Sequence, residues 1–101
     1  MDINRALRMA IDKGKVHLGA RETARALKRG KVQLVIVANN CRQNYMAEFN
    51  KYPKVPIYHF SGTNIELGSA CGKPFPISSL AVIDSGNSNI MNLIQEPGER
   101  P

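Results

Sequence analysis

Apolar and polar residues follow two different periods along this chain, and these periods predict helices and strands in alternation. From Ile3 to Ile11, apolar residues recur three and four positions apart, the spacing of one apolar helix face. Asp2 is suited to cap this helix, and Gly14 is placed to end it. Pattern and helix propensity predict further helices over residues 20–29, 43–51 and 87–95, with Gly30 closing the first of them.

Short apolar runs between these helices predict strands. Residues 34–38 (L-V-I-V-A) are continuously apolar, which is typical of a strand buried on both faces. Runs at 16–18, 57–60 and 80–83 predict three more strands. The alternation predicts an α/β fold, a three-layer α/β/α sandwich with a central four-stranded mixed sheet. We expect a single domain over residues 1–95, and a disordered tail over the polar, proline-flanked residues 96–101.

The charge balance favours a polyanionic partner. The formal net charge is +6 and the isoelectric point is about 9.7, which favours nucleic acid ahead of an acidic membrane surface. No apolar run is long enough to cross a membrane, and the first residues lack the apolar segment of a signal peptide, so we expect a cytoplasmic protein. Cys41 and Cys71 are the only cysteines and share no metal-binding motif, so no metal or cofactor is expected.

A basic helix is the first candidate binding element. Within G-A-R-E-T-A-R-A-L-K-R, which starts at Gly19, four cations share one helical face: Arg21, Arg25, Lys28 and Arg29. Arg21 lies in the first turn, where the helix dipole and free N–H groups already attract anions, so a phosphate or a base edge would be its partner. The alternative is a solvated basic face with Glu22 as its counterion.

Two loops are the other candidates. Asn39 and Asn40 directly follow the buried strand, where their amides could contact base edges or could simply form a turn. Thr63 and Glu66 have the spacing of a capping box, and the short helix that they start should end at Gly72. Beyond it, K-P-F at 73–75 offers a cation and an aromatic ring together, suited to a phosphate and a stacked base. The alternative places this phenylalanine in the core.

Enzyme motifs are weak. The stretch from Gly68 to Pro74 superficially resembles a phosphate-binding P-loop, but it follows a helix, its glycines are too close, and proline replaces the magnesium-binding Ser or Thr. His17 and His59 lack an identifiable catalytic partner and are interpreted as structural.

Four segments, in order, resemble a known family: K-V-H-L-G-A-R-E-T (15–23), L-V-I-V-A-N-N (34–40), N-I-E-L-G-S-A-C-G-K-P-F (64–75) and A-V-I-D-S-G-N-S-N-I (81–90). Together they resemble the L-thirty-e family of archaeal and eukaryotic large-subunit ribosomal proteins, part of the L-seven-Ae-like kink-turn RNA-binding superfamily. The resemblance covers nearly the whole chain. One departure is a shorter stretch between Asn40 and the third strand, which implies a short or distorted third helix.

The resemblance implies an α/β/α sandwich that binds kinked RNA, in which a bulge separates two stems. The positions that match the family's RNA-binding residues are Gly19, Ala20, Arg21, Glu22, Arg25, Asn40, Lys73, Pro74 and Phe75. The implied role is a structural constituent of the large ribosomal subunit that binds ribosomal RNA beside neighbouring ribosomal proteins, with no small-molecule substrate. Two alternatives stay open: a kink-turn RNA-binding core protein of a small guide-RNA particle, and a small α/β enzyme that uses Cys41 or Cys71.

Overall fold

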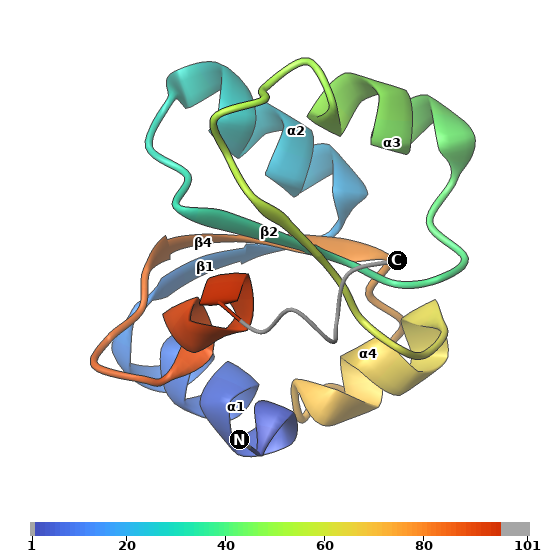
Figure 1. Cartoon of the computed structure of the whole chain (residues 1–101). Coiled ribbons are helices and arrows are strands. Elements are labelled where there is room, and N and C mark those ends of the chain that lie inside the picture. Colours follow the sequence, from blue (N-terminus) through green and yellow to red (C-terminus); the bar gives the residue numbers. More distant parts are fainter. Residues whose placement is uncertain (1, 96–101) are drawn as a thin grey trace.

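The structure is a computed structural model, which describes the backbone of residues 2–95 and the side chains of residues 2–93. Helices and strands alternate along the chain and form a three-layer sandwich (Figure 1), as the sequence predicts. In chain order the elements are α1 (Ile3–Lys13), β1 (Lys15–Leu18), α2 (Ala20–Arg29), β2 (Leu34–Val37), α3 (Gln43–Phe49), β3 (Ile57–His59), α4 (Asn64–Ala70), β4 (Ser79–Asp84) and the 3₁₀-helix η1 (Ile90–Gln95).

The sheet is four-stranded and mixed, in the order β1-β4-β2-β3. β4 runs antiparallel to both β1 and β2, whereas β2 and β3 are parallel. The carboxyl ends of β1, β2 and β3 therefore meet the amino end of β4 at one edge of the sheet. This edge carries the loops that start at Gly19, Ala38 and Phe60 and the loop that ends at Ser78.

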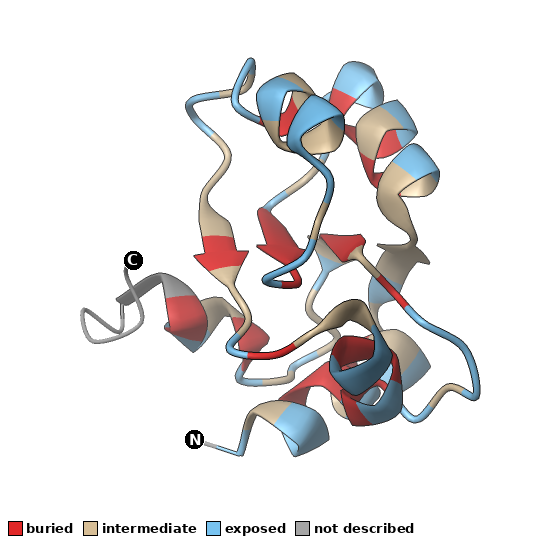
Figure 2. Ribbon diagram, turned by 90° about the vertical axis from the view of Figure 1, so that its right-hand side faces the viewer, coloured by how far each residue is buried: buried red, intermediate tan, exposed pale blue. Residues whose placement is uncertain are grey.

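Two cores lie on opposite faces of the sheet. α1, α4 and η1 cover one face, and α2 and α3 cover the other (Figure 1). β2 contributes to both cores, since Leu34 and Ile36 pack with the first while Val35 and Val37 pack with the second. Burial is concentrated on the strands and the inward helix faces (Figure 2). No helix among the described residues is both long and apolar enough to span a membrane.

Helix ends follow the predicted signals. Asp2 caps α1 by accepting a hydrogen bond of 3.2 Å from the Arg5 backbone N–H. Gly30 ends α2 with a φ of +82°, a left-handed conformation that favours glycine. The capping box of α4 is complete, and Gly72 follows its C-cap with a φ of +76°. As the resemblance implies, the third helix is short, with seven residues in α3.

The last helix differs from its prediction. A helix is present near the predicted residues 87–95, but it begins only at Ile90 and is the 3₁₀-helix η1. Gly86 and Asn87 have φ values of +61° and +66°, and this left-handed pair delays the helix start. Ile90 and Leu93 face inward as predicted. The predictions for the Ile94 side chain and for the tail over 96–101 fall outside the described residues.

Candidate nucleic-acid interface

The predicted binding segments converge at the edge where β1, β2 and β3 end. The segments are distant from one another in sequence, but backbone hydrogen bonds connect them in the fold. These bonds measure 2.8 to 2.9 Å and run from Gly19 N to Ser79 O, from Ala38 N to Ser78 O, from Asn39 N to Gly62 O and from Ile77 N to Asn64 O. The start of α2, the loop after β2, the start of α4 and the loop before β4 therefore form one rigid surface.

The start of α2 leaves backbone donors without a side-chain cap. Gly19 is the N-cap with a φ of +102°, and no side chain of the described residues caps the helix there. Its carbonyl accepts from both the backbone N–H and the hydroxyl of Thr23, at 2.9 and 2.8 Å. The first-turn N–H groups, those of Ala20, Arg21 and Glu22, have no intrahelical acceptor. With the positive end of the helix dipole, they make a site suited to an anion.

The cations of α2 are all exposed. Arg25 forms an ion pair of 3.2 Å with Glu22, so the counterion in the solvated-face interpretation does exist. Both side chains are about half exposed, at 58% and 44%, and such a pair contributes only about 0–1 kcal/mol. A phosphate could therefore displace it at little cost. Arg21 has no ion-pair or hydrogen-bond partner among residues 2–93, and it remains available to a ligand.

Asn40 is held by the amino end of α4. Its Oδ1 accepts from the backbone N–H of Asn64 at 2.8 Å, and its Nδ2 donates to Asn64 Oδ1 at 3.0 Å. Because a backbone N–H can only donate, this contact fixes the orientation of both amides. Each amide keeps donor capacity directed away from the pair. Asn40 is exposed, and its two hydrogen bonds to Asn64 orient its amide in the free protein.

The recognition loop, residues 72–76, is anchored at both ends. Lys73 N donates to Gly68 O at 3.0 Å, and beyond the loop the Ile77 side chain is fully buried. Pro74 and Pro76 restrict the backbone on either side of Phe75. The Phe75 carbonyl lies so close to Gly68 that a Cβ there would be 2.0 Å from its oxygen. The loop can therefore lie against α4 only because residue 68 is glycine.

Phe75 is 49% exposed. The alternative that places it in the core is therefore wrong, although its contact with RNA stays a prediction. Pro74 is also exposed, and Lys73 is half-buried beside it. A half-exposed ring on an anchored loop has lost much of its conformational freedom already, which favours stacking on a ligand.

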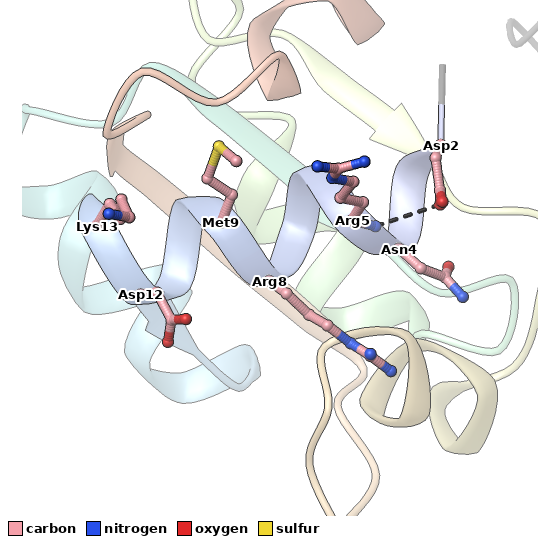
Figure 3. A pocket seen from close by; sticks show the side chains of 7 residues that line it. All are labelled: Asp2, Asn4, Arg5, Arg8, Met9, Asp12 and Lys13. Carbon is pink, nitrogen blue, oxygen red and sulfur yellow. Dashed lines mark hydrogen bonds between the residues drawn. The ribbon is translucent and has the colours of Figure 1, made fainter.

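The start of the recognition loop also contacts α1 through Arg8. Arg8 extends from α1 toward α4 (Figure 3) and donates through Nη2 to Ser69 O at 3.4 Å. A Cβ added at Gly72 would lie 3.3 Å from Arg8 Nε, so the Arg8 side chain lies beside that exposed glycine. The cation at the carboxyl end of α4 complements the negative end of the helix dipole.

Two residues of this surface were missed by sequence reasoning. Ile65, a large aliphatic residue, is 70% exposed in the first turn of α4. Its spacing from the buried Leu67 and Ala70 already places it on the outer helix face, so periodicity could have identified it. Asn64 could not have been identified, because only the fold brings it to Asn40.

The structure gives little support to thiol chemistry. Burial raises the pKa of Cys71 to about 11, despite the nearby Lys73 and Arg8, which lower it. Burial also raises the pKa of Cys41, and a backbone hydrogen bond with Arg42 opposes this rise only in part. Both thiols are thus protonated at neutral pH and are poor nucleophiles. No group of three or more metal-ligating side chains occurs within the part of the chain that the structure describes.

Comparison with known proteins agrees with the geometry. A model of the Ribosomal protein L7Ae/L30e/S12e/Gadd45 family matches residues 1–92. The chain belongs to this family. The resemblance carried by the four sequence segments is therefore confirmed.

Similar members of the L7Ae/L30e/S12e/Gadd45 family come from archaea. The Large ribosomal subunit protein eL30 of Methanococcus maripaludis strain C5 is 48% identical over 99 residues, which cover 95% of this chain and 93% of that protein. The proteins of the same name from Methanocaldococcus jannaschii and Methanothermobacter thermautotrophicus are 42% and 41% identical, over 95% and 93% of this chain and 90% and 99% of their own lengths.

Proposed function

We propose that this protein is a structural constituent of the large ribosomal subunit that binds ribosomal RNA at a kink-turn. Family membership and the names of its relatives support the ribosomal role. The observation that carries the RNA-binding role is the convergence of three chemically different elements at one sheet edge. These are an uncapped helix start, an oriented asparagine pair and an anchored aromatic loop.

Each element suits a different part of a kinked RNA. The first-turn N–H groups of α2, with Arg21 and Arg25, bind phosphates at the bend. The donors left on Asn40 face base edges of the internal loop. Phe75 covers an extruded base, with Lys73 neutralising the phosphate beside it. Single-stranded bulges are the usual targets of sequence-specific RNA recognition, because their bases can leave the stack.

Binding alone accounts for this role, and no chemical step is needed. The protein acts in the cytoplasm within the ribosome, in contact with ribosomal RNA and with neighbouring ribosomal proteins. The small α/β enzyme is disfavoured by the raised pKa values of both thiols. A core protein of a small guide-RNA particle would use the same surface, and copurified RNA separates the two: ribosomal RNA in one case, guide RNA in the other.

The experiment that tests RNA binding compares two RNAs of equal length and composition, one with a kink-turn and one a straight duplex. Gel-shift titrations at one fixed salt concentration should show tight binding to the kink-turn only. Weak, equal binding to both RNAs would mean that the positive charge attracts any polyanion without recognising the bend.

A further inference from the structure

A second basic surface lies away from the proposed kink-turn site. It is a small depression between the edge strand β1, the carboxyl end of α2 and the loop after it. Its polar lining consists of Lys15, His17, Arg29 and Lys31, above the apolar Ala26 and Ile83. We call these four polar residues the edge cluster.

The edge cluster and the kink-turn site are at opposite ends of α2. The ten residues of α2 span about 15 Å at the usual rise per residue. Gly19 precedes the helix and Arg29 ends it, and β1 runs alongside from Lys15 toward Gly19. A molecule that contacts both surfaces must therefore extend along the helix.

The positive charge of the edge cluster is only partly offset by the protein. None of its side chains has an ion-pair partner among residues 2–93. Asp84 is the register partner of Lys15 and offsets part of its charge, although no ion pair forms and its Oδ1 accepts a hydrogen bond of 2.9 Å from Gly86 N in the following turn. Glu22, on the same helix as Arg29, is paired with Arg25.

The helix dipole explains only part of the edge cluster. A cation such as Arg29 in the last turn of a helix is favoured by the dipole without any ligand. Lys15 and His17 come instead from a strand, and Lys31 comes from the loop after Gly30. The left-handed conformation of Gly30 turns the chain and starts that loop. Lys15, Arg29 and Lys31 thus come from three separate segments and line one depression. Their mutual electrostatic repulsion would be reduced by a bound anion.

The size of the depression indicates which anion fits. Its volume is about 60 Å³, whereas small-molecule sites usually hold roughly 300–1,000 Å³. It can admit phosphate oxygens but not a nucleotide. The larger depression of about 470 Å³ on α1 differs in charge, since Asp2 and Asp12 alternate there with Arg5, Arg8 and Lys13 (Figure 3). Of these two depressions, only the one lined by the edge cluster has charged side chains of a single sign.

We propose that the edge cluster binds backbone phosphates of a double-stranded RNA stem that extends from the kink-turn. This inference rests on the proposed function, because only a stem that leaves the kink-turn site and runs along α2 would reach the edge cluster. Lys15, Arg29 and Lys31 supply charge, and His17 supplies a hydrogen-bond donor. The contact adds affinity without reading sequence.

The test uses the full chain and two kink-turn RNAs, one with minimal stems and one with each stem longer by a helical turn. The variant Lys15→Ala/Lys31→Ala removes two exposed cations, and Lys15→Arg/Lys31→Arg keeps the charge. The matched control is Arg5→Ala/Lys54→Ala, which removes two exposed cations elsewhere, on α1 and next to the opposite edge strand β3. Kd is measured from low to high salt.

On the long-stem RNA, the alanine variant should bind about tenfold more weakly at low salt, with a salt slope smaller by about 1.4–1.8 for two lost phosphate contacts. On the minimal RNA it should match the wild type, and the arginine variant should match it on both. If the alanine variant and the control behave alike on the long-stem RNA, the edge cluster is not an RNA contact. If the wild-type protein itself fails to prefer a kink-turn over a straight duplex, the proposed function fails instead.

Discussion

Phe75 offers the sharpest test of the recognition loop, because its side chain divides between protein and solvent. Because Phe75 is 49% exposed, Phe75→Ala should cost roughly 0.8–1.5 kcal/mol of folding stability, half the value for a fully buried residue. The solvent-facing half should stack on a base, and losing that stacking costs about 1–3 kcal/mol of binding free energy. The corresponding rise in Kd for kink-turn RNA is about 5-fold to 150-fold.

Two assays separate these effects. Thermal unfolding of the free protein measures the stability term, which for a chain of this size lowers Tm by roughly 3–12 °C. Fluorescence anisotropy with labelled kink-turn RNA, well below Tm, measures the binding term. Phe75→Leu is the matched control, because leucine keeps much of the apolar packing but cannot stack. It should preserve Tm better than it preserves affinity. A normal Kd with a lowered Tm for Phe75→Ala would refute the reasoning, since the ring would then act only on the protein.

Three further predictions concern other parts of the molecule. Arg21→Ala/Arg25→Ala should reduce the salt slope of kink-turn binding by about 1.4–1.8, whereas an unchanged slope in affinity titrations would leave these arginines as solvated surface. Gly68→Ala puts a Cβ 2.0 Å from a loop carbonyl oxygen, so Tm and RNA affinity should both fall; a variant that keeps both would show that the loop tolerates displacement. Burial raises the pKa of Cys71 to about 11, so at neutral pH this thiol should react with a thiol reagent far more slowly in the folded protein than in denaturant. Fast labelling of Cys71 in the folded protein would instead support the enzyme alternative.

Most of the fold could be predicted from sequence, because its local signals agree with one another. The bounds predicted for α2 are those observed, since a basic amphipathic pattern ends in a left-handed glycine. The run at β2 predicts burial on both faces, and all four of its residues are buried. The start and the type of the last helix were not predicted, because the local sequence does not require Asn87 to adopt a left-handed conformation.

The geometry of the candidate site was harder to predict from the sequence, because it depends on contacts between residues that are distant along the chain. Whether Phe75 packs inside or faces outward depends on the path of the whole loop, whose backbone packs against Gly68 of α4, and no local pattern reveals that path. The pairing of Asn40 with Asn64 likewise requires the parallel arrangement of β2 and β3. Ile65 is different, since its place on the outer face of α4 follows from helical periodicity alone.

The central claim is that the edge where β1, β2 and β3 end is the RNA-binding surface. Backbone amide NMR shifts, followed as kink-turn RNA is added to the full chain, test this claim most directly. The account predicts that the largest changes fall at residues 19–25, 39–40, 64–65 and 73–76. It would be contradicted if those amides stayed unchanged while the largest changes fell on α1 or on the loop between α3 and β3.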